Sequence, residues 1–375
     1  MSLRTVRGFG LLLSAGALLA ACALGPDKPK PKPLVEFTPQ IAGKMVWQQR
    51  LDGVGFPLTV AVNDGVFTLA GNDGTVVALR ADTGRELWRA SAGGKLSAGV
   101  GSDGRFAAVV TRDGELVTLE AGAVKWRKAL GSRVTTAPLV AGERVFVLGV
   151  DRSVNAFDAL DGRKLWTLQR PGDPLTLSQS GVLAAFKDTL VVGQGPRMAG
   201  LDPLRGSVRW EVPVATPRGT NEVERLADLV GPVTRFGNVV CARAFQSAVG
   251  CVNAERGTLV WTKNTGGTDA VAADDGYVFG ADATDRLTAW RTTSGEIAWT
   301  TDSLLYRGLS APLSAGRTLV VGDADGMVHW LSRDKGEPQL RMSTDGSAVA
   351  TAPVASGLTM LVVTRQGGVF AFRPE

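Results

Sequence analysis

The chain has 375 residues, of which 44% are apolar and 21% are charged, a composition typical of a globular protein with a substantial core. Its formal charge of +5 is dispersed: Arg4 and Arg7 supply two charges, residues 23–43 supply one, and residues 44–375 carry only the remaining +2. This distribution argues against a nucleic-acid partner.

The first 21 residues have the pattern of a secretory leader. A basic stretch, MSLRTVRG, precedes about thirteen apolar or small residues, too few for a stable membrane span. The cleavage region Leu19-Ala20-Ala21-Cys22 resembles the lipobox of bacterial lipoproteins. We interpret residues 1–21 as a signal peptide and Cys22 as the acylated, membrane-anchoring first residue of the mature protein. An ordinary signal peptide with an incidental cysteine is the alternative. The residue after the cysteine is Ala23 and not the Asp that marks retention in the inner membrane. This resembles the sorting signal of outer-membrane lipoproteins, so we expect a protein that is lipid-anchored in the outer membrane and faces the periplasm.

Residues 22–43 are interpreted as a tether. The stretch GPDKPKPKP alternates Lys with Pro, which favours extended polyproline II and resists packing. We expect this segment to hold a soluble body, residues 44–375, away from the membrane.

One phrase recurs about every 40 residues in this body, as in repeat proteins. Clear copies are ADTGRELW (81–88), DALDGRKLW (158–166) and RTTSGEIAW (291–299). Tryptophan ends the phrase at positions 47, 88, 126, 166, 210, 261 and 299, and Leu340 takes its place in an eighth copy. The phrase predicts a glycine-containing turn followed by a strand.

Three further strands precede each phrase. Runs such as RVFVLGVDRSVNAFD (144–158) and TLVVGDADGMVHWLS (318–332) read as strand, turn and strand, and a shorter strand such as TAPVASG (351–357) comes before them. Each unit therefore predicts strands A, B, C and D of one four-stranded antiparallel blade.

The two chain ends complement each other. Trp47 has no A, B or C strand before it, and the last unit has no D strand after it. We therefore predict an all-β, eight-bladed β-propeller, closed by pairing the strand around Trp47 with the C-terminal blade.

Most of the repeated residues are expected to be structural. Glycine permits a positive φ in the C-to-D turn, and tryptophan buries its ring between neighbouring sheets while its N–H finds a backbone carbonyl. Cys241 and Cys251 flank a predicted B–C turn near Gln246, and in an oxidising compartment we predict a disulfide between them. Two buried free thiols are the alternative.

Two connections are longer than the repeat requires. The tryptophan spacing rises to 44 before Trp210 and to 51 after it, and in both units the surplus lies between strand D and the next strand A. The candidate partner-binding residues are Leu175 and Leu177 in the first connection and Glu222, Glu224, Arg225, Leu226 and Asp228 in the second. An apolar centre with a charged rim on a rigid scaffold indicates protein docking. The alternative is an ordinary strand start in the first connection and a solvated loop or single helical turn in the second.

The eight-fold repeat resembles the pyrroloquinoline-quinone-type propeller repeat. The whole chain resembles the BamB family, the lipoproteins of the outer-membrane β-barrel assembly (BAM) complex. GDPLTLSQSG (172–181) and TNEVERLADLVGPV (220–233) are similar to two loops that, in this family, bind the periplasmic POTRA domains of BamA. The resemblance implies a non-catalytic scaffold without a cofactor, a single propeller within a hetero-oligomeric complex, which assists folding and insertion of outer-membrane proteins. Binding of nascent outer-membrane proteins at a blade edge is a further hypothesis.

Residues suited to catalysis are sparse. His329 is the single histidine and is interpreted as structural, and the sequence has no zinc motif or nucleophile elbow. DADG (323–326) is interpreted as a hairpin turn and not as half of a calcium loop, so no metal site is expected. The alternative functions are a quinone- or metal-dependent periplasmic dehydrogenase, disfavoured by the lack of an adjacent cysteine pair, and a scaffold of another envelope complex.

Overall fold

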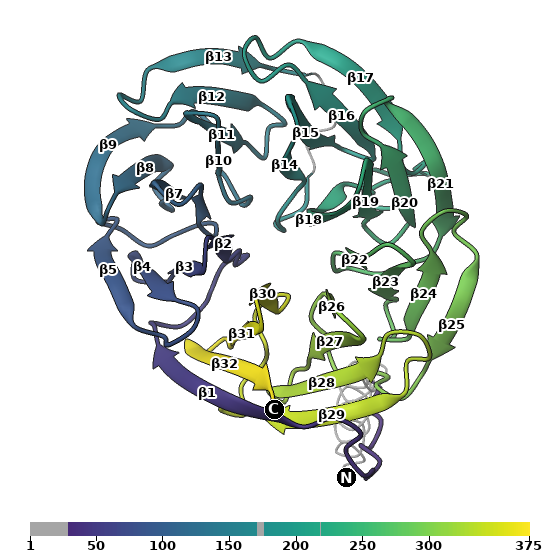
Figure 1. Ribbon diagram of the computed structural model, residues 1–375. Coiled ribbons are helices and arrows are strands. Elements are labelled where there is room, and N and C mark those ends of the chain that lie inside the picture. Colours follow the sequence, from purple (N-terminus) through teal and green to yellow (C-terminus); the bar gives the residue numbers. More distant parts are fainter. Residues whose placement is uncertain (1–28, 171–175, 218) are drawn as a thin grey trace, which may run out of the picture.

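Strands are the only regular elements in the part of the chain that the computed structural model describes, residues 29–170, 176–217 and 219–375. They form eight four-stranded antiparallel sheets arranged in a ring (Figure 1). No helix in this part is long and apolar enough to cross a membrane. The predicted all-β, eight-bladed propeller is confirmed.

The first four blades each run from an inner strand A to an outer strand D. Blade 1 comprises β2 (Ala61–Asn63), β3 (Val66–Ala70), β4 (Thr75–Arg80) and β5 (Glu86–Ser91). Blade 2 comprises β6 (Gly101–Ser102), β7 (Phe106–Val110), β8 (Glu115–Glu120) and β9 (Ala123–Ala129). Blade 3 comprises β10 (Leu139–Ala141), β11 (Arg144–Leu148), β12 (Val154–Asp158) and β13 (Lys164–Leu168). Blade 4 comprises β14 (Leu183–Phe186), β15 (Thr189–Gln194), β16 (Arg197–Leu201) and β17 (Val208–Pro213).

The next three blades repeat this order, and the last one uses both chain ends. Blade 5 comprises β18 (Leu229–Phe236), β19 (Val239–Ala244), β20 (Ala248–Asn253) and β21 (Thr258–Asn264). Blade 6 comprises β22 (Ala272–Ala273), β23 (Tyr277–Ala281), β24 (Leu287–Arg291) and β25 (Ile297–Thr301). Blade 7 comprises β26 (Leu313–Ala315), β27 (Thr318–Gly322), β28 (Met327–Ser332) and β29 (Pro338–Ser343). Blade 8 comprises β30 (Val354–Ser356), β31 (Thr359–Val363), β32 (Gly368–Pro374) and β1 (Gly43–Arg50).

Ring closure follows the predicted pairing of the two ends. Strand β1 pairs antiparallel with β32, in a register that runs from Gly43 opposite Pro374 to Arg50 opposite Gly368. The N-terminal strand thus supplies strand D of the last blade, as its orphan tryptophan predicts.

The repeated tryptophan and glycine contact each other across blades. Nε1 of Trp261 in blade 5 donates to the carbonyl of Thr292 in blade 6 at 2.8 Å. The ring lies against Gly295, whose φ is 68° and where a Cβ would come within 2.7 Å of the ring atom Cδ2. The same packing joins Trp47 to Gly84, Trp88 to Gly122, Trp126 to Gly162, Trp166 to Gly206, Trp210 to Gly257 and Trp299 to Gly336. The predicted role of glycine holds, and the predicted indole bond to a backbone carbonyl is present at Trp47, Trp126, Trp166, Trp261 and Trp299. The ring contact is a second reason for glycine in the C-to-D turn.

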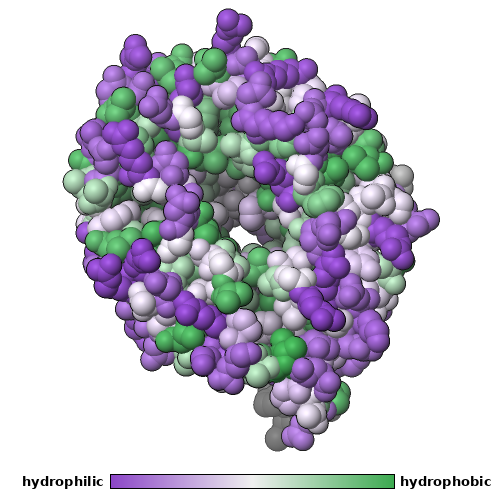
Figure 2. All heavy atoms as spheres, viewed as in Figure 1, coloured by the Kyte–Doolittle hydropathy of each residue, from purple (hydrophilic) through white to green (hydrophobic). Residues whose placement is uncertain are grey.

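The hydrophobic core lies between blades. Phe146 and Leu148 of β11 pack against Leu190 and Val192 of β15, and other clusters likewise join neighbouring blades. At the centre, Figure 2 shows an opening with hydrophobic residues around it and hydrophilic side chains toward the rim. Each sheet therefore buries its faces against the next, which makes the ring stiff.

The two cysteines of blade 5 face each other. Cys241 of β19 is opposite Cys251 of β20, and their sulfur atoms are joined in a disulfide. Both residues are buried, and the turn between the strands includes Gln246 at a positive φ of 49°.

The segment ahead of β1 packs more closely than its composition predicts. The amide of Lys32 donates to the carbonyl of Leu305 at 2.9 Å, and the amide of Gln40 donates to the carbonyl of Gln339 at 2.8 Å. The expectation that the Lys-Pro tether resists packing is therefore wrong for residues 32–42, because blades 6 and 7 offer partners that no local pattern reveals. Residues 1–28, including Cys22, lie outside the described residues.

Candidate functional site

Two long connections meet on one face of the ring. Residues 169–182 join β13 to β14, and residues 214–228 join β17 to β18. The amide of Gly231 donates to the carbonyl of Ser180 at 2.8 Å, and Gly181 forms an isolated bridge with Val230. The end of the first connection therefore lies beside the start of β18, where the second connection ends, as their places in successive blades predict.

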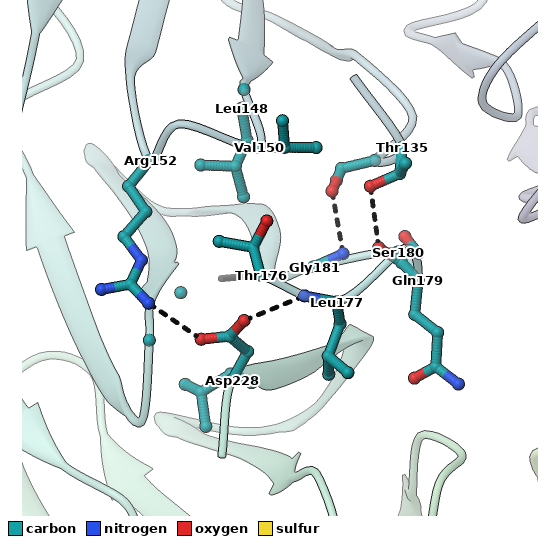
Figure 3. A pocket seen from close by; sticks show the side chains of 15 residues that line it. Thr135, Leu148, Val150, Arg152, Thr176, Leu177, Gln179, Ser180, Gly181 and Asp228 are labelled. Atoms are coloured by element: carbon teal, nitrogen blue, oxygen red, sulfur yellow. Dashed lines mark hydrogen bonds and ion pairs between the residues drawn. The ribbon is translucent and has the colours of Figure 1, made fainter. Parts of the chain in front are cut away.

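Asp228 ties these connections to a third segment. Its Oδ2 accepts the backbone N–H of Leu177 at 3.2 Å, and its Oδ1 lies 3.4 Å from Nη2 of Arg152, which belongs to the turn between β11 and β12 (Figure 3). The side chains of Arg152 and Asp228 are only 18% and 16% exposed. The carboxylate of Asp228 is thus directed into the protein, where it positions both connections.

An ion-pair cluster holds the start of the first connection. Arg170 Nη1 donates to Glu211 Oε2 of β17 at 2.6 Å, and Arg197 of β16 pairs with the other carboxylate oxygen. Burial raises the pKa of Glu211, but the hydrogen bonds from Arg170 and Arg197 outweigh it, so that the pKa lies below its usual range. Glu211 is therefore ionised and fixes the connection at its base.

The second connection contains a single helical turn. The amide of Arg225 donates to the carbonyl of Asn221 at 3.2 Å, and the amide of Glu224 donates to Asn221 Oδ1 at 2.9 Å. Glu224 Oε2 accepts the amide of Thr220 at 2.7 Å, a capping arrangement that lowers the pKa of Glu224. This local structure is the alternative that the sequence leaves open, and it is compatible with docking because it presents side chains on a fixed backbone.

The predicted partner-binding residues differ in what they present to solvent. Glu222 and Arg225 are exposed, Leu226 and Leu177 are half-buried, and Leu175 lies outside the described residues. Glu224 and Asp228 accept hydrogen bonds from the connections themselves.

Sequence reasoning misses two residues of this region. Val223 is 71% exposed at the tip of the turn, between the two glutamates. Its spacing of three from Leu226 on a helical turn is a signal that could have identified it. Arg152, which holds Asp228, lies far away in the sequence, so no local pattern identifies it. We refer to Leu177, Glu222, Val223, Arg225 and Leu226 as the loop surface.

The space directly beneath the first connection is small. A cavity of about 60 Å³ lies beneath the first connection and is lined by residues that include Thr136, Leu148, Leu177 and Gly181 (Figure 3). A space of this size accommodates one or a few water molecules. On its other side, the first connection borders a larger open space of about 500 Å³, which is lined by Ser178, Ser180 and Gly231 among other residues.

The histidine is enclosed in blade 7. His329 Nε2 lies 3.0 Å from Asp323 Oδ2, and Arg307 Nε donates to the same oxygen at 2.8 Å. Asp323 and Gly326 belong to the turn between β27 and β28, so DADG is the predicted hairpin. Across the described residues, no group of three or more His, Cys, Asp or Glu side chains is placed to hold a metal ion.

Comparisons with known proteins agree on one family. A family model described as outer membrane protein assembly factor BamB matches residues 72–301. The chain is 37% identical to the outer membrane protein assembly factor BamB of Burkholderia pseudomallei over 368 residues, which cover 96% of each chain. It is 27% identical to the factor of the same name from Escherichia coli K12 over 391 residues, which cover 99% of each chain.

Solved structures share the fold. The crystal structure of BamB from Moraxella catarrhalis matches with a TM-score of 0.80 at 24% identity and covers 88% of this chain and 99% of that one. Quinohemoprotein alcohol dehydrogenase from Comamonas testosteroni matches with a TM-score of 0.67 at 18% identity and covers 88% and 76% of the two chains. Both likenesses concern the fold alone, and the family is shown by the family model and the sequence relatives. The chain therefore belongs to the family of the outer membrane protein assembly factor BamB.

Proposed function

We propose that the protein is a lipid-anchored scaffold of outer-membrane protein assembly that binds the periplasmic POTRA domains of BamA through the loop surface. The observation that carries this proposal is the joining of two neighbouring connections by Asp228, supported by the hydrogen bond from Gly231 of β18 to Ser180 of the first connection. Membership of a family of assembly factors supports a non-catalytic role.

The loop surface has the chemistry of a protein-docking site. Val223 is an exposed apolar side chain, with Leu226 beside it and the charges of Glu222 and Arg225 around it. Such a patch gains free energy when its apolar centre is dehydrated, and the charged rim sets the orientation of the partner. The rigid blades beneath reduce the conformational entropy lost on binding.

A matched pair of substitutions tests this proposal. Val223→Glu places a charge at the centre of the loop surface, so we expect the affinity for the purified periplasmic domains of BamA from the same organism to fall at least about tenfold. Leu358→Glu is the control, because Leu358 is 76% exposed in the turn between β30 and β31, away from the long connections. Equal affinity of the two variants would refute docking at the loop surface.

The lipid anchor is proposed at Cys22 and has its own test. Replacing Cys22 by Ser removes the acylated thiol, so we expect the protein to move from the membrane fraction to the soluble periplasmic fraction and to lose labelling by palmitate. Retention in the membrane fraction would show that another part of the chain provides the attachment.

A further inference from the structure

Residues 32–41 cross the outer side of blade 7. In Figure 1 the segment ahead of β1 runs past β29. The amide of Gln40 donates to the carbonyl of Gln339, near the start of β29. At the other end, the amide of Lys32 donates to the carbonyl of Leu305, and its Nζ lies 3.1 Å from Asp302, just after the end of β25. The segment therefore passes from the face with the C-to-D turns to the face with the D-to-A connections.

Two arginines hold residues 32–37 of this segment. Arg341 Nη2 donates to the carbonyl of Val35 at 3.3 Å, and its guanidinium carbon lies 5.1 Å from the centre of the Phe37 ring. Arg307 Nη1 donates to the carbonyl of Lys32 at 3.3 Å. Leu34 packs against the core between blades 6 and 7, and Ile41 packs against the core between blades 7 and 8.

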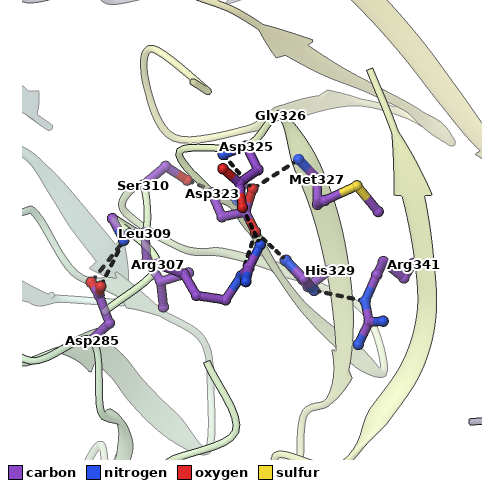
Figure 4. A network of polar contacts seen from close by, with 12 residues as sticks. Asp285, Arg307, Leu309, Ser310, Asp323, Asp325, Gly326, Met327, His329 and Arg341 are labelled. Atoms are coloured by element: carbon purple, nitrogen blue, oxygen red, sulfur yellow. Dashed lines mark hydrogen bonds and ion pairs between the residues drawn. The ribbon is translucent and has the colours of Figure 1, made fainter. Parts of the chain in front are cut away.

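The two arginines are also held by contacts within blade 7 and its flanking loop. Arg307 pairs with the fully buried Asp323, and Asp323 also contacts His329 (Figure 4). Arg341 Nε in turn lies 3.4 Å from Nδ1 of His329. A preorganised set of donors captures a backbone at a smaller loss of entropy than flexible surface side chains would.

We propose that residues 32–41 form a strap that makes the lipid anchor leave the propeller at blade 7, on the face that carries the loop surface. The proposal rests on the acylation of Cys22 in the proposed function. Ten peptide units separate Cys22 from Lys32 and span at most about 35 Å, whereas a tether that was free up to Gly43 would span about 75 Å. The strap therefore halves the reach of the anchor and turns the loop surface toward the membrane, so that a bound periplasmic domain lies on the membrane side of the disc.

Protease protection tests the strap itself. A glutamate-specific protease cleaves after Glu36, and we expect the bond to Phe37 to resist it in the native protein. Leu34→Ser combined with Phe37→Ser removes the core contact of Leu34 and the contact of the Phe37 ring with Arg341, the two side-chain contacts that flank Glu36, so cleavage at Glu36 should accelerate at least tenfold. Val35→Ser is the control, because that side chain is 74% exposed and only its backbone carbonyl contacts Arg341. Rapid cleavage of the native protein at Glu36 would overturn the strap.

Energy transfer to a membrane tests the orientation. The full lipidated protein is bound to vesicles of phosphatidylethanolamine and phosphatidylglycerol that contain an acceptor-labelled lipid, with a donor dye at Gln366→Cys or at Lys335→Cys. Gln366 lies in the turn between β31 and β32, on the face of the loop surface, and Lys335 lies in the turn between β28 and β29, on the opposite face. We expect stronger transfer from position 366 than from position 335, and the Leu34→Ser/Phe37→Ser variant should lower transfer at position 366 and abolish the difference.

The outcomes separate the two proposals. Equal transfer from both positions, or stronger transfer from position 335, overturns the orientation even if the strap is protected from the protease. A protein that does not associate with vesicles overturns the anchor of the proposed function, and with it the orientation, while the protease result still reports on the strap.

Discussion

Replacing Gly295 by Ala tests whether the contact between tryptophan and glycine stabilises the ring. Gly295 has a φ of 68°, and an added Cβ would lie 2.7 Å from the ring of Trp261, a side chain that is only 7% exposed. Gly316 is the matched control: its φ is 62°, and no atom of the described residues lies within 4 Å of an added Cβ. Both substitutions meet the strain of a positive φ, about 1 kcal/mol, but only the first displaces a ring.

The expected magnitudes differ enough to measure. Displacing the Trp261 ring adds an overpacking term of about 1–3 kcal/mol, and losing its hydrogen bond to Thr292 adds about 1 kcal/mol. For a chain of this size, about 1 kcal/mol corresponds to about 1.5 °C in Tm, so Gly295→Ala should melt about 3–6 °C below Gly316→Ala. Thermal unfolding followed by far-ultraviolet circular dichroism measures the difference.

A double substitution identifies the cause. In a Trp261→Leu background the ring is absent, so the additional Gly295→Ala change should cost only the strain of the positive φ. Equal melting of the two glycine variants, or an undiminished effect of Gly295→Ala in the Trp261→Leu background, would refute the ring contact as the reason for glycine.

Three further predictions concern the disulfide, the buried histidine and the loop surface. Replacing Cys241 and Cys251 together by Ala should lower the free energy of unfolding by about 2–3 kcal/mol, and the native protein should react with a thiol reagent only after reduction and unfolding. Burial lowers the pKa of His329 despite the opposing effect of Asp323, with Arg341 and Arg307 adding to the decrease. The unfolded chain therefore binds the proton more readily, so stability should decline as the pH falls below about 6.5 and level off below the folded-state pKa; urea unfolding at pH 7.5 and pH 5 of the native protein and of His329→Gln should show a smaller decline in the variant. Asp323 loses its stabilising charge only below its own pKa, which lies under the ordinary 3.8, so it does not contribute in this range. Asp228→Ala should weaken binding of the periplasmic domains of BamA severalfold without removing an exposed contact, because it removes both acceptor oxygens and so releases Leu177 and Arg152; unchanged affinity would show that the loop surface holds its shape without Asp228.

The fold is predictable because every pair of neighbouring blades packs through the same kind of contact. Trp261 and Gly295 belong to neighbouring units, so their repetition in the sequence records a packing rule and not a local preference. Closure is predictable for a related reason. The strand that contains Trp47 has no A, B or C strand before it, and the last three strands of the chain have no strand D after them, so the two ends complete one blade. The position of the two connections also follows from the repeat, since a surplus at one point of successive units must appear on the same face.

Other features depend on contacts between distant residues that no local pattern reveals. Asp228 is predicted to belong to the charged rim of the docking surface. Its carboxylate instead points to Arg152, which lies 76 residues away in the sequence. The Lys-Pro segment has the composition of a free tether, yet Arg307 and Arg341 bind its backbone from 275 and 306 residues away. In both cases, the decisive partner is an arginine that is itself positioned by the folded blade.

The strap and the loop surface together suggest that orientation matters more than reach for this scaffold. Releasing the strap roughly doubles the length of the tether, and effective concentration falls with about the −3/2 power of length, so the local concentration of a membrane-bound partner would drop only about threefold. A threefold change corresponds to less than about 1 kcal/mol. The larger consequence is that a released propeller could turn either face to the membrane, whereas Asp228 and Gly231 hold the loop surface on one face only. Strap variants should therefore impair assembly of outer-membrane proteins more than they impair binding of the isolated POTRA domains in solution.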